Sequence, residues 1–223
     1  MTDDIASRLA RLDACAISDA LDQLDLQPAV TGIRPLAARQ RISGRVITVR
    51  LAAGPPPADA PPRHLCTHAI DRAERGDVIV VEQATGVECA GWGGILSNAA
   101  RRKGVSGAII EGPARDIDEA IEIGFPIHAR SATARTARGR IHEAETGGII
   151  KVGAATVWDG DYVVADSSGV AFIPALRIEE VLQAAERIAA REAAMTRSVH
   201  DGVAVSSVMG GTYENLLTAG QEA

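Results

Sequence analysis

The sequence predicts an α/β protein with a mixed sheet, organised as a layered α/β sandwich. Two observations indicate this fold class. In the first half, helical stretches alternate with short apolar strands, which is typical of helix–strand units. Between residues 148 and 173, four short strands are separated by turn residues, and this close spacing is typical of antiparallel strands. We therefore expect a single domain over residues 1–223, with a C-terminal helical segment over residues 176–220.

The expected elements follow from periodicity and from turn residues. We expect helices over residues 5–12, 18–24, 63–75, 95–103, 117–123, 178–199 and 212–217, and strands over residues 45–51, 78–82, 107–111, 126–129, 148–152, 155–157, 162–165 and 170–173. Ser18 or Asp19 is expected to cap the second helix. Gly112 and Pro113 are expected to end the strand before them, because both residues interrupt regular structure.

The composition indicates a globular protein with an aliphatic core and excludes some functions. Apolar residues make up 46% of the chain but aromatic residues only 3%, so few side chains are available to stack on bases. The net charge of −6 also disfavours contacts with nucleic-acid phosphates. There is no apolar run long enough for a membrane span. Cys15, Cys66 and Cys89 fit no disulfide or zinc pattern, and the N-terminus lacks a signal core, so we expect a cytoplasmic protein.

The segment over residues 91–119 predicts a binding site. Gly93 and Gly94 form a turn before a helix, whose first N–H groups are suited to an anion. Arg115 and Asp116 follow a strand at its carboxyl end, where open α/β sheets bind ligands. These features together favour a site for a small oxyacid with a metal ion. The alternative is structural: Asp116 would cap the helix that follows, and the Arg–Asp pair would lie on the surface.

Other motifs are weaker or absent. His64 and His68 are spaced one helical turn apart, which suits a metal pair, but a helix surface is the favoured interpretation because no second pair of ligands is nearby. No glycine-rich dinucleotide loop, phosphate loop or nucleophile elbow is present.

The stretch GGILSNAARRKGVSGAIIEGPARDIDE resembles the RraA-like family, the group of the 4-hydroxy-4-methyl-2-oxoglutarate aldolases and the regulators of ribonuclease E activity. Three more stretches carry the resemblance: GDVIVVE at residues 76–82, GFPIHAR at 124–130 and DGDYVVADSSGVAFIP at 159–174. The resemblance implies an α/β/α sandwich with a swivelling-domain-like core. It also implies a homotrimer or a homohexamer.

The resemblance further implies a metal-dependent lyase that cleaves a small 2-oxo acid and releases pyruvate, as an aldolase or an oxaloacetate decarboxylase. By motif, Arg115 would bind the carboxylate and the 2-oxo oxygen of the substrate, and Asp116 would ligate Mg²⁺ or Mn²⁺. A hard divalent cation prefers oxygen ligands and keeps several waters, so one carboxylate can suffice. The remaining substrate-binding residues would be Gly93, Gly94, Ile95 and Leu96.

One position departs from the aldolase pattern. The aldolases carry a carboxylate twenty-one residues before the arginine, and here that residue is Gly94. Glu111 is a candidate substitute as the catalytic proton carrier, and it can equally be a structural residue at the end of its strand. Glu192, from the C-terminal helix of a neighbouring subunit, is a second carboxylate to consider, although a solvated helix residue is the simpler interpretation. The alternative function is a non-catalytic regulator that binds a partner enzyme.

Overall fold

The computed structural model describes residues 2–58 and 63–210, and it confirms an α/β protein with a mixed sheet. The helices are α1 (Thr2–Leu9), α2 (Ala14–Gln23), α3 (Thr67–Arg72), α4 (Gly94–Lys103), α5 (Ile117–Glu122), α6 (Ile178–His200) and α7 (Val205–Val208), with a 3-10 turn at Ala175–Arg177. The strands are β1 (Arg34–Ala37), β2 (Ile42–Ala53), β3 (Val78–Glu82), β4 (Gly107–Ala114), β5 (Ile127–Ala132), β6 (Ile141–Thr146), β7 (Ile150–Val152), β8 (Ala155–Val157), β9 (Tyr162–Ala165) and β10 (Val170–Ile173).

Eight strands form one sheet, in the order β1-β5-β4-β3-β2-β9-β10, with β6 also paired to β2. The neighbours from β2 to β5 are parallel, whereas β1, β6, β9 and β10 pair antiparallel. β7 and β8 form a separate two-stranded sheet. Because the parallel strands end at the same edge, the residues after β4 lie where open α/β sheets bind ligands.

The long strand β2 makes the sheet curl. Its first residues, 42–45, pair with β9, its middle, 46–50, pairs with β3, and its end, 49–53, pairs with β6. One continuous strand thus belongs to both the parallel and the antiparallel part. The inner faces of these two parts pack on each other, with Val80 and Ile109 in the same cluster as Val163 and Phe172.

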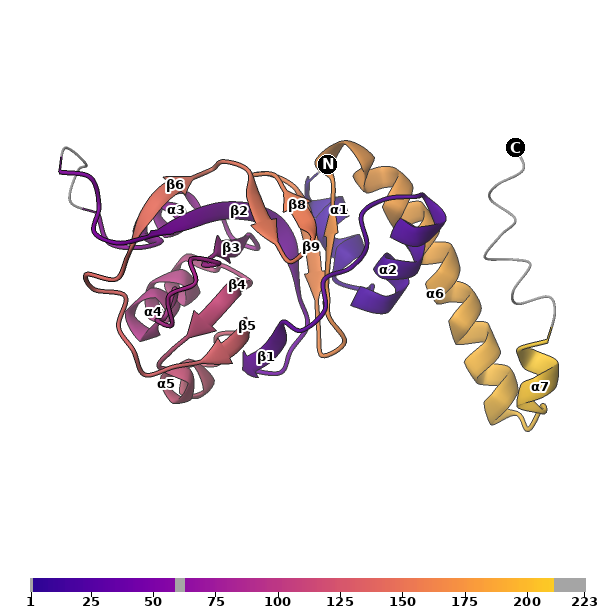
Figure 1. Ribbon diagram of the computed structural model, residues 1–223. Coiled ribbons are helices and arrows are strands. Elements are labelled where there is room, and N and C mark those ends of the chain that lie inside the picture. The colour runs from indigo at the N-terminus through magenta and orange to yellow at the C-terminus, as the bar shows by residue number, and fades with distance from the viewer. Residues whose placement is uncertain (1, 59–62, 211–223) are drawn as a thin grey trace.

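Helices cover the two outer faces (Figure 1). On the parallel part, α3, α4 and α5 pack on the face that carries Ile79 and Ile110. On the antiparallel part, α1, α2 and α6 pack on the face that carries Val164. The layers therefore run helix, sheet, helix as predicted. Between the helices the sheet curls, so that its parallel and antiparallel parts face each other.

The long helix α6 is buried in its first half and exposed in its second. Val181, Leu182, Ala184 and Ala185 are buried against α2 and β9–β10, whereas the side chains of residues 190–210 are exposed or half-buried. Figure 1 shows this second half extending away from the sheet, with α7 at its end. Within the described residues, no helix is long and apolar enough to cross a membrane.

Several predicted boundaries were wrong for physical reasons. Helix α2 begins four residues earlier than expected, because Asp13 rather than Ser18 or Asp19 caps it by accepting a 2.8 Å hydrogen bond from the N–H of Ala16. Strand β4 continues through Gly112 and Pro113, because a shift in register on β5 accommodates Gly112 at φ 157°.

Other predicted bounds also differ: α1 is Thr2–Leu9 where a helix over residues 5–12 was expected, and β2 is Ile42–Ala53 where a strand over residues 45–51 was expected. Strands β1 and β6 were not expected, and α3 is shorter than the predicted helix over residues 63–75. The expected helix over residues 212–217 lies outside the described residues.

Candidate active site

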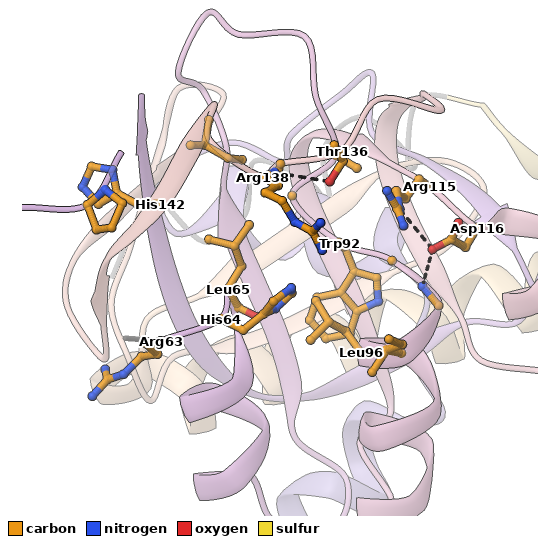
Figure 2. Close-up of a pocket in the computed structure, with 18 residues that line it drawn as sticks. Arg63, His64, Leu65, Trp92, Leu96, Arg115, Asp116, Thr136, Arg138 and His142 are labelled. Atoms are coloured by element: carbon orange, nitrogen blue, oxygen red, sulfur yellow. Dashed lines mark hydrogen bonds and ion pairs between the residues drawn. The ribbon is translucent and has the colours of Figure 1, made fainter. Parts of the chain in front are cut away.

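A cavity of about 320 Å³ opens beside the first turn of α4. Three segments enclose it: the chain around Trp92, the turn at residues 63–65 and the loop between β5 and β6 (Figure 2). Its lining includes Arg115 and Asp116 as well as Gly93, Gly94, Ile95 and Leu96. The structure therefore brings together six of the seven residues that the sequence proposed for the site.

The floor of the cavity is apolar and fixed. Trp92 is 1% exposed and stacks on Phe125 with a ring-centroid distance of 6.1 Å. Its indole N–H donates a 3.0 Å hydrogen bond to Ser97 Oγ, which lies in α4. Leu65 and Leu96 are buried beside it. Because the indole is held on both sides, the floor is rigid and its apolar surface faces the ligand.

Arg115 is placed by the backbone at the end of β4. Its N–H donates a 3.0 Å hydrogen bond to the carbonyl of Trp92, and Ala114 forms a parallel bridge with Trp92. The guanidinium Nε donates a 3.1 Å hydrogen bond to Asp116 Oδ2, and the side chain is 38% exposed. Within the described residues its other guanidinium N–H groups make no hydrogen bond, and Arg115 lines the cavity, so these donors are available to an oxyanion.

Asp116 turns its carboxylate back toward α4. Its backbone lies in the left-handed region at φ 57°, which is uncommon for a residue other than glycine. Oδ2 accepts a 2.8 Å hydrogen bond from the N–H of Gly94, and Asp116 makes no capping bond to α5. Asp116 therefore stands at the N-cap position of α5 without capping it through its side chain, and the exposed Arg115–Asp116 ion pair of the structural alternative is present. A strained backbone held in this way is typical of functional sites.

This contact changes the expected anion site at α4. The N–H of Gly94 is engaged by Asp116, so it is not free for a substrate carboxylate. The N–H groups of Ile95 and Leu96 still lie in the first turn, where no preceding carbonyl of the helix can accept from them. Gly93 must be small, because a Cβ there would lie 2.9 Å from Asp116 Oδ2.

A second carboxylate occupies the place of the missing side chain at Gly94. A Cβ built on Gly94 would lie 1.9 Å from Glu119 Oε2 and 2.6 Å from its Cδ. Asn98 holds this carboxylate by donating a 2.7 Å hydrogen bond from Nδ2 to Oε1, while the same Nδ2 donates to the carbonyl of Gly94 at 2.9 Å. Glu119 thus places a carboxylate beside Gly94, although it does not itself line the cavity.

The sequence analysis assigned no role to Glu119, although a signal was present. Gly94 lacks the expected carboxylate, and Glu119 lies one helical turn beyond Asp116. The helix α5 packs beside α4, which brings the two positions together.

Glu111 and Glu192 lie elsewhere. Glu111 follows Ile110 on β4 and faces the opposite side of the sheet, where Arg130 pairs with both of its oxygens at 2.8 and 3.0 Å. It does not line the cavity, so the structure favours its structural role. Glu192 lies on the exposed half of α6, across the sheet from α4. It can approach this cavity only from a second copy of the chain.

The site fits a divalent cation held largely by water. Among the residues that the structure describes, no group of three or more histidine, cysteine or carboxylate side chains could surround a metal. Asp116 offers Oδ1, since its contacts with Gly94 and Arg115 both involve Oδ2. Mg²⁺ is commonly held by one or two carboxylates while keeping several waters, so this donor set is compatible with it.

The turn over residues 63–66 forms the wall opposite α4. His64 lies before α3 and lines the cavity, so the interpretation of His64 as part of a helix surface is wrong. The carboxylate of Glu143, whose side chain is 3% exposed, fixes this turn. It accepts a 2.6 Å hydrogen bond from the N–H of Cys66 and one of 2.7 Å from Thr146. Burial raises the pKa of the Cys66 thiol, and the charge of Glu143 adds to the effect.

Comparisons with known proteins identify relatives of this chain. The chain is 30% identical over 204 residues to a putative 4-hydroxy-4-methyl-2-oxoglutarate aldolase of Halalkalibacterium halodurans, and the match covers 90% of each protein. It spans only 29% of the length of another relative, protein DlpA of Legionella pneumophila, with 25% identity over 179 residues.

Two solved structures share the fold. An uncharacterized protein of Pseudomonas syringae matches with a TM-score of 0.83 and 25% identity, over 94% of this chain and 98% of that one. Streptomyces coelicolor RraAS2, an unusual member of the RNase ES inhibitor RraA protein family, matches with a TM-score of 0.74 and 21% identity, over 85% and 93%. The family model for RraA-like proteins, described as Aldolase/RraA, matches residues 14–172, and the chain therefore belongs to the RraA-like family.

Proposed function

We propose that this protein is a metal-dependent carbon–carbon lyase that acts on a small 2-oxo acid and releases pyruvate, as an aldolase or an oxaloacetate decarboxylase. One observation carries the proposal: Arg115 and Asp116 line the cavity at the start of α4, and the carboxylate of Glu119 lies beside Gly94, outside that lining. A guanidinium and two carboxylates at one point are the groups that this reaction requires.

Each side chain has a distinct task. Arg115 binds the substrate carboxylate and the 2-oxo oxygen through the donors that Asp116 does not use, and it stabilises the negative charge that grows there as the bond breaks. Asp116, through Oδ1, would hold Mg²⁺ or Mn²⁺, and such a cation polarises a 2-oxo group and stabilises an enolate. Glu119 accepts and returns a proton beside Gly94, which is the role that the missing carboxylate would have had.

The site also controls water and orientation. The hydrogen bond from Gly94 to Asp116 locks the carboxylate in one direction, so Arg115 and Asp116 do not reorganise when substrate binds. Trp92 and Leu96 form an apolar surface next to the reacting atoms, which excludes water and strengthens the electrostatic contacts.

The direct test is a pyruvate-release assay with oxaloacetate and 4-hydroxy-4-methyl-2-oxoglutarate, with Mg²⁺, with Mn²⁺ and with a chelator. Asp116→Asn should abolish the metal-dependent rate without unfolding the protein. Asp118→Asn is the matched control, because Asp118 is an exposed carboxylate two residues away that does not line the cavity. Equal metal affinity in wild type and Asp116→Asn by calorimetry would contradict the assignment.

The alternative is a regulator that binds a partner enzyme and performs no chemistry. The absence of a carboxylate at position 94 favoured that function. The position of Glu119 weakens this argument, because Glu119 on α5 places its own carboxylate beside Gly94. A wild-type protein without lyase activity on either 2-oxo acid in the presence of metal would bring the regulator back as the leading hypothesis.

We also propose a homotrimer or homohexamer in the cytoplasm. The exposed outer half of α6 offers a helical surface for a neighbouring copy, and Glu192 lies on it. The cysteines Cys15, Cys66 and Cys89 are free thiols, which is compatible with a reducing compartment.

A further inference from the structure

The wall of the cavity opposite α4 carries a histidine to which the proposed chemistry assigns no role. His64 lies in the turn before α3 and lines the cavity. Figure 2 shows its ring directed into the cavity beside Trp92, whereas Arg63 turns away from it. Within the described residues, the imidazole makes one hydrogen bond, between Nδ1 and the carbonyl of Leu65 at 3.3 Å. The other ring nitrogen, Nε2, is therefore available to a ligand in the cavity.

The contact with Leu65 determines which ring nitrogen carries the hydrogen. A backbone carbonyl can only accept a hydrogen bond, so Nδ1 is the donor in this contact. When the hydrogen of a neutral imidazole is on Nδ1, Nε2 holds a lone pair and acts as a base, and the protonated ring acts as an acid through the same atom. The backbone thus prepares the free nitrogen of His64 for proton transfer.

The turn that carries His64 is held in place by its neighbours. Thr67 Oγ1 donates a 2.9 Å hydrogen bond to the carbonyl of His64. The carboxylate of Glu143 accepts the N–H of Cys66 at 2.6 Å, and the backbone of Cys66 lies in the left-handed region at φ 62°. Because the turn is already ordered, the binding of a substrate need not bring the ring to this wall.

The two other histidines near this wall are less suited to the task. His68 lies on α3 outside the lining of the cavity, and its Nδ1 is 3.5 Å from an arginine side chain. His142 lines the cavity, and its Nδ1 contacts the carbonyl of Gly54 at 3.0 Å. Figure 2 shows His142 farther from Arg115 than His64 is. His64 is therefore the histidine placed to meet a ligand that Arg115 holds.

Release of pyruvate involves proton transfer at two positions of the substrate. In aldol cleavage a base takes the proton of the hydroxyl group, and the electron pair of the broken carbon–carbon bond forms the enolate of pyruvate. Carbon 3 of the enolate then takes up a proton and becomes the methyl group. Decarboxylation releases carbon dioxide and needs only this second proton. Glu119 lies beside Gly94 and outside the lining of the cavity, whereas His64 lines it.

We propose that His64 is the catalytic acid that protonates the enolate carbon. Nε2 of the imidazolium gives its proton to carbon 3, the electron pair of the enolate double bond forms the new carbon–hydrogen bond, and the neutral ring regains a proton from water. The inference rests on the proposed function, in which Arg115 and Asp116 bind the 2-oxo acid head. It adds that the two proton transfers take place on opposite walls, with Glu119 beside α4 and His64 facing it.

Exchange of the methyl protons of pyruvate with deuterium isolates this step, because it needs no cleavable substrate. In D₂O with Mg²⁺, wild type should exchange these protons, as followed by proton NMR. His64→Gln should slow the exchange by about a hundredfold or more, since a positioned proton carrier contributes about 10²–10⁴ in rate. Added imidazole should restore part of the exchange in His64→Gly, above the rate that imidazole produces without protein, which a purely structural role of His64 would not allow.

Two measurements separate proton transfer from binding and folding. Calorimetry should show that His64→Gln binds pyruvate within about twofold of wild type, and circular dichroism should show that it is folded. Nitrogen NMR of the wild-type imidazole should place the hydrogen of neutral His64 on Nδ1. His68→Gln is the matched control, because it removes an exposed imidazole four residues away that does not line the cavity, and its exchange should stay within about twofold.

The outcomes distinguish this inference from the proposed function. Exchange that persists in His64→Gln, or that falls equally in His68→Gln, overturns the role of His64, and so does a neutral ring with its hydrogen on Nε2. Loss of pyruvate binding in His64→Gln would make His64 a binding residue and overturn its role as an acid. Wild type that releases pyruvate from oxaloacetate without exchanging its methyl protons overturns the role of His64 alone. Wild type that does neither overturns both proposals.

Discussion

The proposed role of Glu119, as a replacement for a carboxylate at position 94, can be tested by placing a carboxylate at position 94 instead. Gly94 has an ordinary helical backbone, with no φ in the left-handed region, so the backbone does not prevent a side chain there. The obstacle is Glu119, whose Oε2 would lie 1.9 Å from the new Cβ. Gly94→Asp therefore expels Glu119 and places two like charges together. This single variant should gain no lyase activity. The aldolase pattern of the sequence, taken alone, suggests instead that a carboxylate at position 94 raises activity.

The double variant Gly94→Asp with Glu119→Ala removes the clash with Glu119 and leaves a single carboxylate, which residue 94 now carries. Loss of a positioned proton carrier costs about 10²–10⁴ in rate, so Glu119→Ala should lower kcat by about a hundredfold or more. That factor corresponds to about 2.7 kcal/mol in the activation free energy. The double variant should recover at least about tenfold of the loss.

The expected loss in the free energy of unfolding is smaller than this loss in activation free energy. Expelling Glu119 breaks its 2.7 Å hydrogen bond from Asn98, and a bond to a charged group at an exposed position is worth about 1 kcal/mol. Gly94→Ala is the control, because it expels Glu119 without supplying a carboxylate. It should lose activity to the level of Glu119→Ala while remaining folded.

The assay is release of pyruvate from oxaloacetate and from 4-hydroxy-4-methyl-2-oxoglutarate, with unfolding followed by circular dichroism. Two results would refute the reasoning. Wild-type kcat in Glu119→Ala would show that this carboxylate transfers no proton. A gain of activity in Gly94→Asp alone would show that Glu119 does not serve in place of the missing side chain.

Three further predictions concern stability and assembly. Glu111→Gln weakens the ion pair with Arg130 and should lower the free energy of unfolding by about 1–3 kcal/mol. Its kcat should stay within about twofold, because Arg130 holds the Glu111 carboxylate on the face of the sheet away from α4. A large loss of kcat in the folded variant would restore Glu111 as a catalytic candidate. Burial lowers the pKa of His128 from 6.5 to about 4 in the folded protein. As the pH falls, the unfolded chain therefore binds a proton at His128 before the folded protein does. The free energy of unfolding should drop by about 3 kcal/mol between pH 6.5 and 4. Urea titrations should show this slope in wild type and a shallower one in His128→Leu; parallel slopes would contradict it. Light scattering at micromolar concentration should give the mass of a trimer or hexamer, and a monomer would exclude neighbour-supplied groups such as Glu192.

The sequence by itself determined the fold class and the location of the site. Helix–strand alternation and closely spaced turns predicted the mixed sheet, because hydrophobic periodicity reports local structure directly. Arg115 and Asp116 lie at the carboxyl end of β4 and line a cavity, and their binding role stays a prediction that rests on this edge being a general location for ligands. Strands such as Val78–Glu82 and Val170–Ile173 were predicted residue for residue, because turn residues bound them on both sides.

Only the tertiary structure showed which carboxylates lie near the start of α4. Glu111 lies beside the correct strand end, but side chains alternate between the faces of a strand, and the face of Glu111 became known only with the packing of Ile110 against α4 and α5. Glu119 is remote from Gly94 in sequence, and the two meet because α5 packs on α4. Such contacts between helices depend on the curl of the whole sheet, which local periodicity does not encode.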